Sequence, residues 1–116
     1  MFPSRTKAAE IARDTVEIVA AGRYLNGRGE KVVIRPLVEA AMDGTVGYPP
    51  GAGLPPVSVM YRKTVFEVVN DTTLAAARKL VAEGFRPVAL NFASARHPGG
   101  GFLNGARAQE ESLCRA

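Results

Sequence analysis

Three consecutive segments between residues 64 and 93 constrain the fold more than any other part of the chain. The run TVFEVVN (64–70) is rich in β-branched and aromatic residues, which favours a strand. TLAAARKLVAE (73–83) has apolar residues at helical spacing, and PVALNFA (87–93) is nearly all apolar, which is typical of a strand buried on both faces. Strand, helix and strand in this order form a βαβ unit with a parallel sheet. We therefore predict an α/β fold.

The boundaries of the elements follow from capping residues. Asp71 or Thr72 is expected to cap the helix over 73–83, and Gly84 to end it. In the first half, the apolar spacing predicts a helix over 5–21, capped by Ser4 and ended by the glycine that follows it.

Further along, EKVVIR (30–35) is predicted to be a short strand, and PLVEAAMD (36–43) a helix that starts on proline and stops before Gly44. Four prolines and three glycines in residues 45–56 predict an irregular loop. VSVMY (57–61) is a further candidate strand. No repeat or linker marks a domain boundary, so residues 1–116 are expected to belong to one domain.

Composition narrows the class of protein. A hydrophobic content of 47% with 22% charged residues is typical of a soluble globular fold. No run is long enough to span a membrane, the first residues lack a signal-peptide core, and a single cysteine argues for a reducing cytoplasm. One histidine and one cysteine are too few ligands for a structural zinc site, so we expect no metal and no cofactor. The net charge of +4 suits an anionic partner, but the basic residues are scattered, and direct nucleic-acid binding is not expected.

A glycine triplet follows the last predicted strand. In an open α/β sheet, ligands bind beyond the carboxyl ends of the strands, which is where Gly99, Gly100 and Gly101 lie. Glycines let the backbone approach a ligand and direct N–H groups at it, and a diphosphate is the natural recipient. A plain surface turn is the alternative. The pattern is neither a P-loop nor a dinucleotide-binding fingerprint.

Two adjacent glutamates follow the triplet. Glu110 and Glu111 are predicted to lie in the first turn of a final helix capped by Asn104 or Gly105. Neighbouring helical residues point about 100° apart, so one carboxylate can bind while the other transfers a proton. The alternative is that both only complement the helix dipole. Asn91, polar within an apolar strand, is either a satisfied buried amide or a group that faces the site.

Residues 91–116, NFASARHPGGGFLNGARAQEESLCRA, resemble the signature of the bacterial-type poly(ADP-ribose) glycohydrolases, which are enzymes with a macrodomain fold. Their mark is a glycine triplet and, after a short spacer, Gln-Glu-Glu; here seven residues separate Gly101 from Gln109. The segment VVNDTTLAAARKL and the N-terminal helix are also similar to that family.

The resemblance implies a three-layer α/β/α domain with a mixed or parallel sheet, which binds ADP-ribose and hydrolyses the ribose–ribose O-glycosidic bonds of poly(ADP-ribose). It implies that Glu111 is the catalytic acid and that Glu110 holds the ribose hydroxyls. The loop of Gly99 to Gly101 would clasp the diphosphate, with Phe102 beside it. The site-supporting residues that it implies are Asn91, Ser94 and Gln109.

The family also implies more chain than is present. The final helix reaches Ala116 without a closing residue, and the predicted strands are too few for a complete sheet. We therefore expect an N-terminal portion of a macrodomain, with a complementary C-terminal fragment as a further candidate partner. An ADP-ribose-binding module without turnover, a hydrolase that releases ADP-ribose from a protein or nucleic-acid acceptor, and a general basic nucleic-acid binder remain alternatives.

Overall fold

The computed structural model describes residues 3–58 and 63–116. Its regular elements, in chain order, are α1 (Arg5–Ala21), β1 (Arg23–Leu25), β2 (Lys31–Val33), α2 (Arg35–Asp43), α3 (Thr73–Ala82), the 3-10 turn η1 (Phe102–Asn104) and α4 (Gln109–Arg115).

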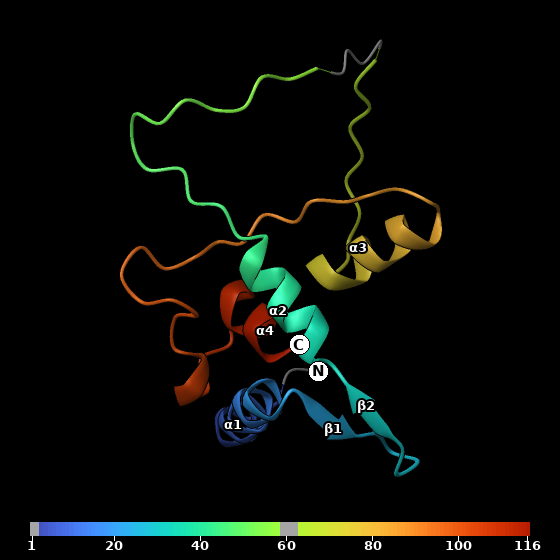
Figure 1. The fold of residues 1–116 in the computed structure, drawn as a ribbon, viewed down its shortest axis with the longest axis vertical. Helices are drawn as coiled ribbons and strands as arrows, with labels where there is room; N and C mark the ends of the chain where they lie inside the picture. The colour runs from blue at the N-terminus through green and yellow to red at the C-terminus, as the bar shows by residue number, and fades with distance from the viewer. Residues whose placement is uncertain (1–2, 59–62) are drawn as a thin grey trace.

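The long helix α1 contacts elements of the first half of the chain and also the elements at its end. Its predicted caps are confirmed: the Ser4 hydroxyl accepts a hydrogen bond from the Lys7 N–H, and the Gly22 N–H donates to the carbonyls at the helix end. One face of α1 packs against η1 and α4, and there Ala8 and Ala12 are fully buried. Figure 1 shows α1 and α4, the two ends of the chain, side by side.

A short antiparallel hairpin follows α1. β1 pairs with β2 in the register Arg23 with Val33, and the Asn26 side chain closes the turn by accepting from the Arg28 and Glu30 N–H groups. The strand expected within 30–35 is therefore confirmed, whereas β1 was not predicted. Helix α2 starts one residue before the predicted proline and ends at the predicted position.

The helix predicted in the second half is confirmed, but the strands around it are not. Thr72 caps α3 by accepting from the Ala75 N–H. Residues 64–70 and 87–93 form no strand, so the predicted βαβ unit and parallel sheet are not confirmed in the described residues, whose sheet has two antiparallel strands. The candidate strand over 57–61 lies partly outside the described residues, and residues 57–58 have no regular structure.

These two segments form no strands because no other strand of the described part of the chain lies beside them to pair with their backbone groups. A strand forms only when another strand takes up its N–H and C=O groups, and its apolar residues need a covering layer. Segment 87–93 was expected to be buried on both faces, yet Val88 is 99% exposed and Phe92 is 70% exposed. Figure 1 shows α3 between two long connections, and its first residue, Thr73, meets Gln109 of α4.

The chain leaves much of its surface uncovered. Its accessible area is 10362 Å², against about 6,100 Å² expected for a folded monomer of this mass. The radius of gyration is 17.1 Å, where a domain of this length has about 13 Å. Among the described residues, no helix combines the length and the apolar character needed to cross a membrane.

Candidate active site

The glycine triplet forms a tight turn that presses against the start of α4. Gly99 and Gly100 have positive φ angles of 79° and 58°, and the Gly100 N–H donates to the His97 carbonyl at 2.8 Å. A Cβ atom placed on Gly100 would collide with Glu111 Oε1 and would lie 3.1 Å from Glu110 Oε2. Glycine is therefore favoured here, because its φ is positive and the backbone runs directly against the ends of two glutamate side chains.

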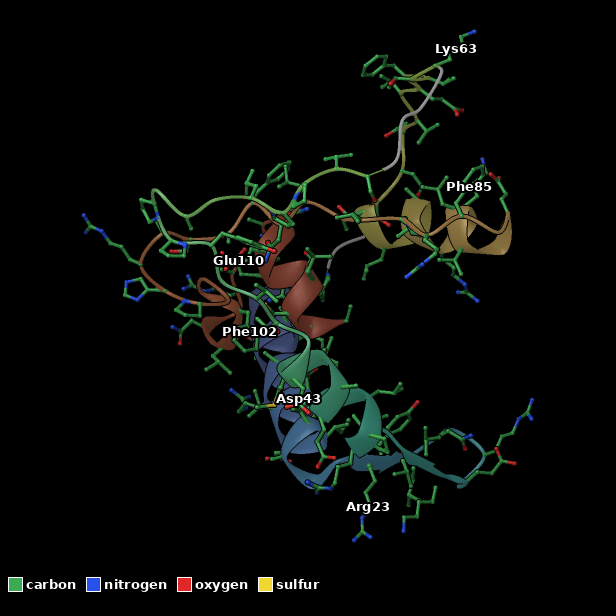
Figure 2. The ribbon with its side chains drawn as sticks, turned by 45° about the horizontal axis from the view of Figure 1, so that its top comes forward. Arg23, Asp43, Lys63, Phe85, Phe102 and Glu110 are labelled. Carbon is green, nitrogen blue, oxygen red and sulfur yellow. The ribbon has the colours of Figure 1, made fainter. Side chains whose placement is uncertain are left out.

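Glu110 is held by two backbone donors. Its Oε2 accepts from the Ser94 N–H at 2.7 Å, and its Oε1 accepts from the Gly99 N–H at 2.9 Å. The residue is only 5% exposed. Both oxygens thus tie α4 to the segment before it, and Figure 2 shows Glu110 at the end of α4 that faces this segment.

Glu111 is held differently. Its Oε1 accepts from the Gly101 N–H at 3.1 Å, while its Oε2 is buried and has no hydrogen-bond partner among the described residues. Donation from the Gly101 N–H, and next from the backbone N–H of Glu111, holds the pKa of this carboxyl below its ordinary 4.5. Burial opposes this shift, and the positive charge of Arg115 supports it. The site therefore contains a buried carboxylate with one oxygen that makes no hydrogen bond to the described residues.

Gln109 completes the contacts of the Gln-Glu-Glu triplet. Its Oε1 accepts from the Phe92 N–H at 2.7 Å, and its Nε2 donates to the Leu90 carbonyl at 2.7 Å and to Thr73 Oγ1 at 3.2 Å. Three consecutive side chains of α4 thus bind three successive parts of the loop over 90–101.

Helix α1 contacts the residues that join this loop to α4. The Arg5 Nε donates to the Asn104 carbonyl at 3.0 Å, and Gly105 is buried against the Arg5 backbone. At the other end of α4, Thr15 Oγ1 donates to the Arg115 carbonyl at 3.4 Å. The position of the glutamates therefore depends on contacts between residues about one hundred positions apart.

The structure brings most of the predicted site residues together. Those that meet at the start of α4 are Ser94, Gly99, Gly100, Gly101, Gln109, Glu110 and Glu111. Phe102 is half-buried, and its ring lies next to Gly99. Asn91 is exposed, so the interpretation of a buried amide is wrong.

All three N–H groups of the triplet donate to acceptors within the chain. One expectation, the residue that caps α4, needs correction. The residue that caps α4 is Ala108, which has no side-chain hydrogen bond, and not Asn104 or Gly105, because these two residues end η1 and α4 starts only at Gln109.

Sequence reasoning also missed two contributors. Arg115 donates to the Phe102 carbonyl at 3.4 Å and lowers the pKa of Glu111. Its position four residues after Glu111 on a helix is a signal that could have identified it. Thr73 Oγ1 accepts a hydrogen bond from the Gln109 amide. No sequence pattern indicates this contact, because the two residues are far apart in the chain.

Little in the described part of the chain resembles a metal site or a closed pocket. Within residues 3–58 and 63–116, no three histidine, cysteine, aspartate or glutamate side chains gather in a way that could hold a metal ion. A groove of about 460 Å³ lies between the start of α3 and α4, and its wall includes Gln109 but neither glutamate.

Comparison with known proteins gave matches over most of this chain. Residues 12–116 match the family model described as microbial-type PARG, catalytic domain. The chain is similar to the crystal structure of poly(ADP-ribose) glycohydrolase (PARG) from Thermomonospora curvata, with 44% identity and a TM-score of 0.80. It is also similar to the same enzyme bound to the inhibitor ADP-HPD (44%, TM-score 0.78) and to a mutant in which alanine replaces a glutamate (47%, TM-score 0.80). Comparison with curated proteins gave no match.

These matches cover 95% of this chain but only 40–42% of the solved structures. The chain thus shares the macrodomain-like α/β fold of these enzymes over the part that it spans. It belongs to the family of microbial-type PARG catalytic domains.

Proposed function

We propose that this chain is the N-terminal portion of a catalytic domain that hydrolyses the ribose–ribose O-glycosidic bonds of poly(ADP-ribose) and releases ADP-ribose. The observation that carries the proposal is the Glu111 carboxylate, buried beside the glycine loop with one oxygen unpartnered among the described residues. A buried acceptor without a donor is costly unless a ligand supplies the missing hydrogen bond. Two comparisons support the same substrate class. Residues 12–116 match the family model, and the similar Thermomonospora curvata enzyme has been solved with the inhibitor ADP-HPD.

In this reaction Glu111 acts as acid and then as base. Its protonated carboxyl gives a proton to the ribose oxygen that leaves, and the glycosidic C–O bond breaks through an oxocarbenium-like state. Water then adds to the anomeric carbon and returns a proton to Glu111. The lowered pKa makes Glu111 a carboxylate in the ligand-free chain. An anionic diphosphate bound nearby raises the pKa of the carboxyl, and thus substrate binding itself prepares the acid.

Glu110 has the role of holding ribose hydroxyls. Each of its oxygens accepts one backbone hydrogen bond, and an ionised carboxylate has about four acceptor positions, so capacity remains for two hydroxyl donors. The bonds to Ser94 and Gly99 fix the direction in which this capacity points.

The loop of Gly99 to Gly101, with Phe102 at its end, is proposed to receive the diphosphate. Because its N–H groups are occupied by the glutamates and by His97, receiving a phosphate requires them to share or exchange these bonds. This exchange would release the glutamate oxygens toward the ribose. Asn91, Ser94 and Gln109 are proposed as supporting residues.

The complete domain is proposed to have three layers around a mixed sheet, with a complementary C-terminal polypeptide as partner. The uncovered apolar residues of 64–70 and 87–93, and an accessible area roughly 4,000 Å² above that of a folded monomer, support this proposal. Strand-like sequences gain their structure when the missing strands pair with them.

Calorimetric titration of the 116-residue chain with ADP-ribose at fixed salt, followed by a hydrolysis assay on poly(ADP-ribose), tests the proposal. We expect Glu111→Gln to keep ADP-ribose binding and to lose hydrolysis, while the exposed control Glu17→Gln changes neither. Equal hydrolysis by Glu111→Gln refutes the assigned acid. Binding without turnover by the unmodified chain, even with the complementary polypeptide added, indicates a binding module instead. Binding of nucleic acid that falls steeply with salt and is indifferent to ADP-ribose indicates a general basic binder.

A further inference from the structure

The hydrogen bonds of Gln109 have the pattern of a β-ladder. One residue of a strand normally bonds to the C=O and N–H groups of the two residues that flank its partner. The Gln109 carboxamide does this around Asn91, because it donates to the Leu90 carbonyl and accepts from the Phe92 N–H, both at 2.7 Å. A side chain thus takes the place of a neighbouring strand.

Glu110 forms the next hydrogen bond along the same edge of this segment. Its Oε2 accepts from the Ser94 N–H at 2.7 Å, two residues beyond Phe92. Residues two apart present their backbone groups to the same side of an extended chain. Leu90, Phe92 and Ser94 therefore form one edge that the start of α4 occupies, and the segment is set in register with the two glutamates.

The chemistry of this position requires a carboxamide. At neutral pH an amide offers a donor for the Leu90 carbonyl and an acceptor for the Phe92 N–H in one planar group, whereas an ionised carboxylate only accepts. A glutamate in its place would set a carboxylate oxygen against the Leu90 carbonyl. The Gln109 Nε2 also reaches Thr73 Oγ1 at 3.2 Å, which links the start of α3 to the same point.

We propose that Gln109 is a positioning residue: its carboxamide substitutes for a strand on the edge of residues 90–94 and thereby fixes Asn91 and Ser94 relative to Glu110 and Glu111. This inference deepens the proposed function and rests on it for the ligand. The register of the segment, however, can be measured without any ligand.

The test uses Gln109→Glu, Gln109→Leu and the control Ser112→Ala, whose side chain is exposed on the same helix. Backbone amide signals are followed by NMR from about pH 7 to about pH 4, a range that spans the ordinary pKa of a glutamate, with the buried Gly105 as a reporter of the α1 contact. We expect the Phe92 amide to be protected from exchange in the unmodified chain and in Ser112→Ala, and to lose roughly tenfold protection in Gln109→Leu, as for a lost hydrogen bond. The Gly105 signal should stay in place in all of them.

The pH dependence of Gln109→Glu separates positioning from a merely structural role. At neutral pH the introduced carboxylate repels the Leu90 carbonyl, and ADP-ribose affinity should fall about tenfold. When that carboxyl is protonated it becomes a donor again. The Phe92 amide shift and the affinity, relative to the unmodified chain at the same pH, should then recover together as the pH falls.

The outcomes are distinct. Unchanged Phe92 protection in Gln109→Leu, or a Gln109→Glu affinity equal to that of the unmodified chain at every pH, overturns the inference. If the unmodified chain binds no ADP-ribose, the proposed function fails for this chain. The exchange of Phe92 and its recovery with pH then still decide whether Gln109 sets the register. A displaced Gly105 signal in Gln109→Glu and Gln109→Leu alike shows a general folding role and also overturns it.

Discussion

Gly100→Ala tests whether the glycine triplet is selected by the glutamates. An alanine at a φ of 58° costs about 1–2 kcal/mol because its Cβ crowds the following carbonyl. Its Cβ would also collide with Glu111 Oε1, which is the end of a flexible side chain and can move only by leaving the Gly101 N–H. A hydrogen bond to a charged group contributes about 1.5–3 kcal/mol. The expected loss is therefore roughly 2.5–5 kcal/mol.

Two other glycines separate these contributions. Gly29 has a φ of 76°, and no atom lies within 4 Å of the position that an added Cβ would take, so Gly29→Ala carries the backbone strain alone. Gly53 has neither a positive φ nor a contact, and its replacement by alanine should be nearly neutral. The free energy of unfolding from urea titration, and the Gly101 amide shift, are measured for all three. A loss for Gly100→Ala no larger than that for Gly29→Ala, with the Gly101 amide unmoved, refutes the reasoning.

Three further predictions concern the same region. Gly105→Ala should destabilise the chain strongly in a thermal melt, because its Cβ would collide with the Arg5 carbonyl, which is backbone and cannot swing away; an unchanged melting temperature contradicts this. Since the folded pKa of Glu111 is lowered, its stabilising contribution is complete above about pH 4.5 and is lost as the pH falls through the lowered value. The Gly101 amide shift should therefore titrate below pH 4.5, and a midpoint above it would contradict the assignment. Burial raises the pKa of the Cys114 thiol above its ordinary 9.0, and the charges of the α4 glutamates add to this shift. Iodoacetamide should therefore modify Cys114 more slowly at about pH 8 than it modifies a free cysteine. An equal rate would show that the thiol is not shielded.

Local chemistry was sufficient to predict the helices. Ser4 and Thr72 carry hydroxyls that satisfy a free N–H in the first turn of a helix, and apolar spacing supplies the rest. These interactions lie within four residues of each other, so they can be recognised in the sequence. The glycine triplet and Gln-Glu-Glu were likewise recognisable as a pair, although nothing in their spacing shows which oxygen meets which N–H.

The contacts that make the site are of another kind. Glu110 meets Ser94 and Gly99, and Gln109 meets Leu90 and Thr73, across 11 to 36 positions of chain. Whether segment 87–93 forms a strand depends in the same way on residues distant in sequence, because β pairing is an interaction between separate pieces of backbone. Residue preferences can make a segment ready to pair, and its pairing is decided by whichever groups the folded chain brings to its edge. In this structure those groups are the side chains at the start of α4.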